Sequence, residues 1–349
     1  MINFFRKIRR KLADDNKPLK YMRYAIGEIV LVVIGILIAL QINNWNEEQK
    51  RELVTMGLMT QARKELLQNI KRTDIVLDYY FERDSLIYKV IKKKVTSEDY
   101  ENNQLYKGLP WDYTFADIVA DDFLNLLENG KIISSDQDSL LIRLKELYSI
   151  DKLSIDKFES YTADIANAFK DKIKEEQSWF SDYRAELITE EMIEFFLNEP
   201  YYLNAVYDVS KISYELHLYR ISSFRYKAGE IYQAISDFLG LEENPIVKRD
   251  LNDFNHYLGH YQYQHSELGN ITMDIVRGSE NNLIQHVYQN DSLIRTSTIY
   301  PYSKTHFIRS GYVPPWQLVI GKTNEIEGVI MVGIYGNGAQ ERPYFNKID

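Results

Sequence analysis

The chain carries an apolar run near its amino terminus, over residues 25–42 (AIGEIVLVVIGILIALQI), which only Glu28 and Gln41 interrupt. At roughly 1.5 Å per residue, a helix of this length covers about 27 Å, close to the roughly 30 Å hydrocarbon core of a bilayer. Because lipid offers no partner to backbone groups, a helix is the only single-pass solution. No small-residue cleavage site follows the run. The pattern therefore predicts a retained transmembrane helix over residues 24–45.

After this run the apolar positions recur every three to four residues, the period of an amphipathic helix. Leu66, Ile70 and Leu77 lie on such a stripe, which predicts that the membrane helix continues outward as a stalk to Ile91. Residues 46–240 are poor in glycine, and they predict a helical stalk and an antiparallel bundle. The other expected helices cover residues 116–128, 135 toward 179, 189–198 and 200–240.

The pattern changes again after residue 258, where short runs rich in Val, Ile, Thr and Tyr alternate with turn residues. Residues 241–258 are expected to form a linker, since Pro245 bars a continuous helix. Residues 259–349 then predict a β-domain, either a meander or a small barrel. The expected fold class is α+β: one transmembrane helix, a periplasmic helical bundle and a carboxyl-terminal antiparallel sheet. The expected strands cover residues 260–264, 271–277, 283–289, 293–300, 305–309, 316–321 and 328–335.

Charge is divided unevenly along the chain. Residues 1–23 hold eight cations and two anions, a net charge of +6, whereas the whole chain carries −9, so that the remainder carries −15. Basic flanks of membrane helices stay in the cytoplasm. The arm over residues 1–23 is therefore expected to be cytoplasmic and the bulk periplasmic, with the anchor in a bacterial inner membrane. The acidic bulk argues against nucleic acid as a partner, because nucleic acid requires a basic face.

Three residues of the membrane segment are candidate contacts with a partner helix. Glu28 is an ionisable group one turn from the cytoplasmic end, where it can reach the headgroups, pair with Lys20 or Arg23, or meet a partner inside the bilayer. Gly35 and Ala39 form a small-xxx-small pair, a surface on which two helices can approach closely. The lipid bilayer is thus one expected partner, and a homodimer through this helix is another.

The candidate chemistry in the rest of the chain is sparse. The chain has no cysteine, which removes disulfides, thiol nucleophiles and cysteine-zinc sites. His256, His260 and His265 are close in sequence, but the odd separation of His260 and His265 sends them to opposite faces of a strand, so no metal site and no cofactor are predicted. Aromatic side chains either pack the β-domain or line its mouth and face a ligand. The candidates for a ligand-facing cluster are Tyr261, Tyr263, Tyr300, Tyr302 and Trp316.

Two stretches resemble known families. The run GEIVLVVIGILIALQINNWNE, preceded by FFRKIRRKL and KYMRYAI, resembles the amino-terminal signature of a family of uncharacterised single-pass bacterial membrane proteins, and residues 114–148 are similar to the helical middle of that family. The family implies a membrane anchor and no activity. The strand layout after residue 258 resembles the small lipocalin-like β-domain that accompanies some serine hydrolases. In those proteins this domain is an accessory.

These patterns favour a membrane-anchored periplasmic module without catalytic chemistry of its own, which binds an envelope protein or a small amphipathic ligand. The alternative is an envelope hydrolase with a site between the helical and β blocks. Carboxylates such as Asp121, Asp122 and Glu128, or the three histidines, would then have to converge in a pocket. The sequence leaves the identity of the partner and the existence of an activity open.

Overall fold

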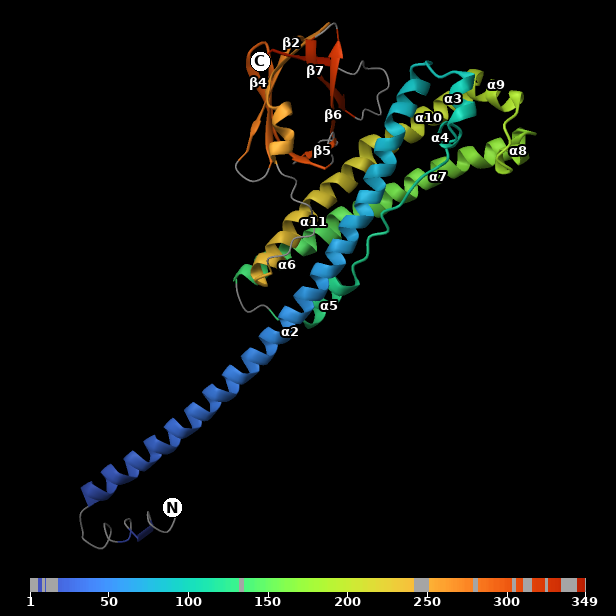
Figure 1. Cartoon of the computed structure of the whole chain (residues 1–349). Helices are drawn as coiled ribbons and strands as arrows, with labels where there is room; N and C mark the ends of the chain where they lie inside the picture. The colour runs from blue at the N-terminus through green and yellow to red at the C-terminus, as the bar shows by residue number, and fades with distance from the viewer. Residues whose placement is uncertain are drawn as a thin grey trace.

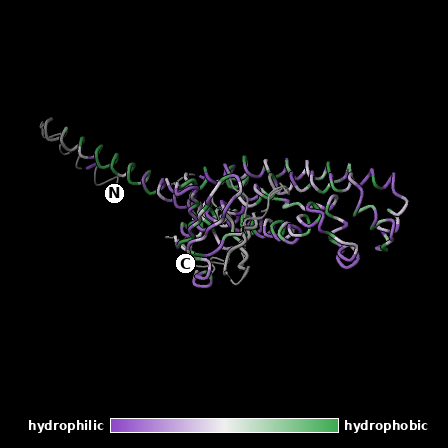
Figure 2. Tube along the Cα trace, turned by 90° about the horizontal axis from the view of Figure 1, so that it is seen from above, coloured by the Kyte–Doolittle hydropathy of each residue, from purple (hydrophilic) through white to green (hydrophobic). Residues whose placement is uncertain are grey.

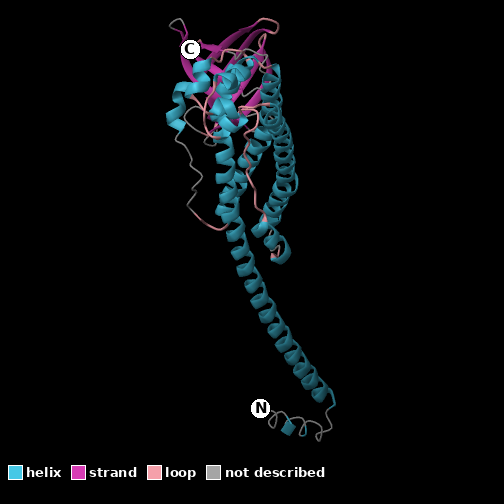
Figure 3. Ribbon diagram, turned by 90° about the vertical axis from the view of Figure 1, so that its right-hand side faces the viewer, coloured by secondary structure: helices cyan, strands magenta, loops and turns pink. Residues whose placement is uncertain are grey.

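The computed structural model describes residues 6–7, 10, 18–131, 135–241, 251–278, 282–302, 306–309, 316–323, 326–333 and 344–348. Three parts are visible in Figure 1: a long helix that projects alone, a helical bundle built around the same helix, and a small sheet domain beside the bundle. Figure 3 shows the sheet domain at the end of the molecule far from the projecting helix. The chain is thus mostly helical with a carboxyl-terminal antiparallel sheet.

Helix α2 (Pro18–Ile91) is the axis of the molecule. At roughly 1.5 Å per residue it is about 110 Å long. Its amino-terminal part projects alone, and its carboxyl-terminal part lies inside the bundle (Figure 1). The helix ends at Ile91, immediately before three lysines, as the stripe of apolar residues predicted. The predicted continuity of the apolar run with the helix that follows it is confirmed.

Two long helical rods and several short helices complete the bundle around α2. One rod runs through α6 (Ser135–Glu146), the π-helical turn η1 (Leu147–Lys152) and α7 (Leu153–Glu176). The other returns through α10 (Pro200–Ile212), the π-helical turn η2 (Ser213–His217) and α11 (Leu218–Phe238). The short helices are α3 (Ser97–Asn102), α4 (Leu105–Gly108), α5 (Asp121–Asn129), α8 (Phe180–Arg184) and α9 (Glu190–Asn198).

Helix boundaries follow local chemistry. Thr189 caps α9 by accepting a hydrogen bond from the Met192 amide, and Pro200 begins α10, where its missing N–H costs nothing. Beyond the end of α11, Gly240 adopts φ +67°, a conformation that favours glycine. These three boundaries were predicted. Helix α5 was not placed correctly, since residues 116–120 form no helix and α5 begins only at Asp121.

The strands form one antiparallel sheet in which each strand pairs with its neighbour in sequence. Strand β8 also pairs with β1, through Tyr261 and Gln262, so the sheet closes into a barrel. The sequence left this closure open, and it did not predict β8. The strands are β1 (Gly259–His265), β2 (Gly269–Arg277), β3 (Leu283–Gln289), β4 (Ser292–Pro301), β5 (His306–Arg309), β6 (Trp316–Thr323), β7 (Ile326–Gly333) and β8 (Tyr344–Lys347).

The bundle and the barrel have separate cores. Leu66, Leu144 and Phe224 belong to the larger bundle core, and a second aromatic core lies around Trp111 and Trp179. The barrel core contains Tyr261, Met273, Val287 and Phe307. The predicted linker ends in the 3-10 helix η3 (Leu251–Tyr257), of which Phe254 and Tyr257 pack into the barrel core. Residues 242–250 of that linker lie outside the described residues.

Candidate functional site

The projecting part of α2 exposes a continuous apolar surface. Figure 2 shows this part as a largely hydrophobic helix that leaves the rest of the molecule. Twelve large apolar side chains between Ile26 and Ile42 are exposed, with Leu31 at 74 %. The segment is long and apolar enough to cross a membrane, a test that an amino-terminal signal sequence also passes.

The candidate contact residues of this segment lie on its open surface. A side chain at Gly35 would meet no atom within 4 Å, and Ala39 is exposed. Glu28 is half-buried near the amino-terminal end of the segment. The side chains of Lys20 and Arg23, its predicted partners, lie outside the described residues.

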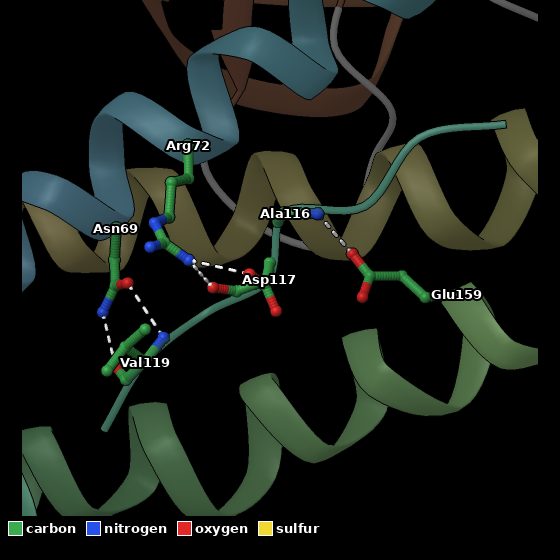
Figure 4. A network of polar contacts seen from close by, with 6 residues as sticks. All are labelled: Asn69, Arg72, Ala116, Asp117, Val119 and Glu159. Atoms are coloured by element: carbon green, nitrogen blue, oxygen red, sulfur yellow. Dashed lines mark hydrogen bonds and ion pairs between the residues drawn. The ribbon is translucent and has the colours of Figure 1, made fainter. Parts of the chain in front are cut away.

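Inside the bundle, polar side chains hold an irregular stretch of chain, residues 112–120, which we call the clamped segment. It runs between α2 and α7 (Figure 4). Asn69 of α2 donates from Nδ2 to the Val119 carbonyl at 2.7 Å and accepts from the Val119 amide at 3.0 Å. The same Nδ2 donates to the Tyr148 hydroxyl at 3.1 Å. The Asn69 side chain therefore pairs with both backbone polar groups of Val119, as a neighbouring strand would in a sheet.

Two further side chains fix the clamped segment. Arg72 donates to the Asp117 carbonyl, and its Nη1 lies 3.2 Å from Oδ2 of the same residue. Asp117 has φ +50°, a left-handed conformation that aspartate tolerates better than bulky residues do. On the other side Glu159 of α7 accepts the Ala116 amide at 2.6 Å (Figure 4). These contacts explain why α5 begins later than the sequence predicted.

Glu159 also lies at one end of a buried row of polar groups. Its Oε1 lies 3.3 Å from His217 Nε2, without the alignment of a hydrogen bond, and His217 Nδ1 lies 2.6 Å from the Tyr80 hydroxyl. His217 is 0 % exposed, and burial raises the pKa of Tyr80. A substrate has no access to these groups in this arrangement. The row joins α2, η2, α7 and the clamped segment, so its evident effect is to hold four parts of the chain together.

Glu65 of α2 holds the beginning of α5. Its carboxylate oxygens accept the amides of Asp122, at 2.8 Å, and Phe123, at 3.3 Å. Such amides at a helix amino terminus have no partner within the helix. Burial raises the pKa of Glu65, and the two amide hydrogen bonds act in the opposite direction. Glu65 thus caps α5 from a neighbouring helix.

The barrel docks on the bundle through two of the five predicted ligand-facing aromatics. The Tyr302 hydroxyl donates to Asp78 Oδ1 at 2.9 Å and lies 3.1 Å from the Asp74 carbonyl oxygen, both on α2. The Tyr300 hydroxyl lies 3.0 Å from that of Tyr226 on α11, and the two rings are 4.7 Å apart. These contacts place Tyr300 and Tyr302 at an interface within the chain.

An ion pair strengthens this interface. Arg225 Nε lies 2.6 Å from Asp74 Oδ1, and the guanidinium carbon lies 5.1 Å from the centre of the Tyr302 ring. Burial raises the pKa of Asp74, and the charge and hydrogen bond of Arg225 act in the opposite direction. Burial also raises the pKa of Tyr302, and the carboxylates of Asp74 and Asp78 add to that shift. The contact region between the two blocks is therefore occupied by paired side chains.

The other three aromatics of the predicted cluster lie in the barrel. Tyr261 is fully buried, and its hydroxyl donates to the Tyr257 carbonyl at 2.7 Å. Tyr263 packs at the edge of the barrel core, 5.4 Å from Phe345 between ring centres. Trp316 begins β6, but its side chain lies outside the described residues. Contact of these aromatics with a ligand stays a prediction.

The groups that the hydrolase alternative would need lie apart. Asp121 and Glu128 are exposed at the two ends of α5, and Asp122 is half-buried there. His260 pairs with Asp274 at 2.5 Å, whereas the ring of His265 accepts the amides of Glu267 and Leu268. The burial pattern of β1 puts His260 and His265 on opposite faces, as predicted. Within the described residues no group of three or more histidines and carboxylates is placed to hold a metal ion.

Residues 28–175 match a family described as "Family of unknown function (DUF6090)". The matched range begins in the apolar segment and contains α5, η1 and the clamped segment with its partners Asn69, Arg72 and Glu159. No curated protein matches the chain, and no solved structure matches it. The match agrees with the expected resemblance to an uncharacterised family over this range. The finer amino-terminal signature and the lipocalin-like character of the barrel stay predictions.

Proposed function

We propose that this chain is a single-pass, membrane-anchored binding module. Helix α2 crosses a bilayer through residues 25–42, and the bundle with its docked barrel forms an interaction head outside it. The anchor sets the distance of the head from the membrane. Thr55 is the first buried residue of α2 after the apolar run, and its hydroxyl accepts the amide of Lys131, just beyond α5, at 3.1 Å. From Ile42 to Thr55 the helix rises about 20 Å. The head therefore stands clear of the lipid surface.

The main support for the proposal is that, among the described residues, none covers the apolar part of α2. None of the apolar window is buried, although the same helix lies in the bundle core from Met59 onward. Leaving a large aliphatic side chain in water forfeits about 1.5–3 kcal/mol. For twelve half-exposed side chains the loss is on the order of 10–20 kcal/mol, as large as the whole stability of a typical domain. Lipid removes this loss.

Charge supports an orientation. The +6 arm before the apolar run would stay in the cytoplasm, and the acidic head would lie on the far side, which is the periplasm of a bacterium with an inner-membrane anchor. The signal-sequence alternative leaves the head without its anchor. It is disfavoured by the continuity of α2, because removal of the apolar run would truncate a helix that continues into the bundle core.

The use of the polar groups supports a binding role. Asn69, Glu159 and His217 are buried and hold the chain itself, and the interface between bundle and barrel is occupied by Tyr302 and its partners. A partner would therefore contact the outer surface of the head. An envelope protein or a small amphipathic ligand is the proposed partner. Within the part of the chain that the structure describes, the carboxylates and histidines named for the hydrolase alternative do not form a metal-binding group.

The anchor is tested by extraction of membranes with alkaline carbonate, applied to the full-length protein. We expect the protein to stay in the membrane pellet. A Val33→Arg, Leu37→Arg double variant puts two charges at mid-bilayer, each at a cost of about 2.5–3.5 kcal/mol on insertion scales, and should appear in the soluble fraction. Release of the unmodified protein by carbonate would refute the anchor.

A further inference from the structure

We propose that two copies of the chain pair in parallel along one face of α2, through a seam that begins inside the lipid and continues into the water layer below the head. The seam consists of Gly35, Ala39, Ile42, Asn46, Gln49 and Leu53. This inference rests on the proposed function, because a shared membrane is what sets the two helices parallel and at the same depth.

The seam residues are spaced by alternating steps of four and three, the repeat of a two-stranded coiled coil. At about 100° per residue, all of them lie within about 40° of the direction of Leu53 on the helix surface. The helix is continuous through the whole range, and every seam residue is exposed, with Leu53 at 69 %. The face is thus uninterrupted, and none of the described residues covers it.

The seam points away from the bundle. Thr55, Met59 and Ala62 are the first residues of α2 that are buried in the head, and they lie roughly 180–240° around the helix from Leu53. Gly57, about 40° from Leu53, is exposed, and a side chain there would meet nothing within 4 Å. As far as Gly57, a second chain can therefore lie along this face without meeting the residues of α2 that are buried in the bundle.

The side chains of the seam are complementary to themselves. Gly35 and Ala39 allow close approach in lipid, where small residues favour helix contacts. Outside the lipid, Asn46 and Gln49 would each meet their own copy, and an amide can donate to and accept from another amide. A single asparagine at such a position is known to fix the register of parallel pairs. In the single chain, Gln49 makes a long contact of 3.5 Å with Glu52.

None of the six seam residues is charged, so like charges do not meet along the seam. Glu47, Glu48 and Arg51 project more than about 100° from the seam direction. Trp45 and Lys50 flank it on its two sides, so that in a parallel pair the exposed indole of one copy faces the ammonium of the other. A second copy is therefore the occupant that fits this face in shape, polarity and charge.

The test uses the absence of cysteine from the chain. Single cysteines are placed at the seam (Asn46→Cys, Gln49→Cys, Leu53→Cys) and on the back of the same helix (Glu48→Cys, Arg51→Cys). The full-length variants are oxidised in native membranes with a copper catalyst, and the disulfide-linked dimer is measured. A disulfide needs Cα atoms within about 7 Å, so the seam positions should give roughly ten-fold more dimer than the back positions.

Adding Gly35→Leu to the Leu53→Cys variant should reduce the yield several-fold, because the larger side chain separates the helices. Equal yields at all positions, a maximum on the back face, or no dimer would overturn the seam. Carbonate extraction of the same membranes separates this failure from failure of the anchor: protein that stays in the pellet without cross-linking contradicts the seam alone. Protein released by carbonate contradicts the proposed function as well.

Discussion

Substitution of Asn69 by alanine should release the clamped segment without unfolding the head. Asn69 makes three hydrogen bonds, two with the backbone of Val119 and one with the Tyr148 hydroxyl. Alanine removes the side chain with which these three groups pair inside the bundle. Each lost bond costs about 0.5–1.5 kcal/mol net, so that the total is roughly 2–4 kcal/mol. Since every 1.4 kcal/mol is a factor of ten, local opening should become about 30- to 700-fold more frequent.

Hydrogen–deuterium exchange on the full-length protein in detergent micelles measures this opening directly. Peptides that contain Ala116 and Val119 should exchange faster in the variant, whereas peptides from α9 should keep their rates. Asn198→Ala is the matched control, because Asn198 is exposed and bonds only with Glu194 of its own helix among the contacts described. Unchanged exchange over residues 112–120 would refute the role of Asn69. So would an equal acceleration everywhere, since it would indicate global unfolding.

Three further outcomes follow from the same structure. Burial raises the pKa of Glu65 above its ordinary 4.5, so the folded chain holds this proton more tightly than the unfolded one, and its contribution to stability is lost as pH rises through the folded pKa. In chemical unfolding, wild type should therefore lose stability relative to Glu65→Gln as pH rises above 4.5; an opposite trend contradicts this. Tyr302→Phe should cost about 1–2 kcal/mol in the same assay, because it removes the bond to Asp78, whereas Tyr161→Phe on the exposed face of α7 should change little. Gly240→Ala should cost about 1 kcal/mol because of the positive φ, and no loss would argue against the helix end described.

Much of the fold was predictable because its signals are local. The apolar run, the stripe toward Ile91, the Thr189 cap and the Gly240 stop each depend on residues within one or two turns. Strand β3 was predicted at its observed bounds, since it consists of a strand-forming run between two plain turns. Barrel closure depends on pairing between β1 and β8, which are far apart in sequence, and no local pattern indicates such a pairing.

The clamped segment was missed for the same reason. Residues 116–120 have helical spacing, but Asn69, Arg72 and Glu159 offer their backbone better partners from distant helices. One signal was present: Glu65 and Asn69 lie one turn apart beside the apolar stripe of the stalk. Polar residues next to a core stripe indicate buried hydrogen bonding. The sequence does not show which segment receives those bonds.

Chemical labelling shows most directly on which side of the membrane the amino-terminal arm and the head lie. Cysteines are introduced singly at Lys7 and at Ser181, both exposed, in the otherwise cysteine-free chain. A membrane-impermeant maleimide is then added to intact cells whose outer membrane has been made permeable. A single crossing with the head outside predicts labelling of Ser181→Cys at once and of Lys7→Cys only after the inner membrane is broken. Labelling of both positions in intact cells, or of Lys7→Cys alone, would contradict a single crossing with the head outside.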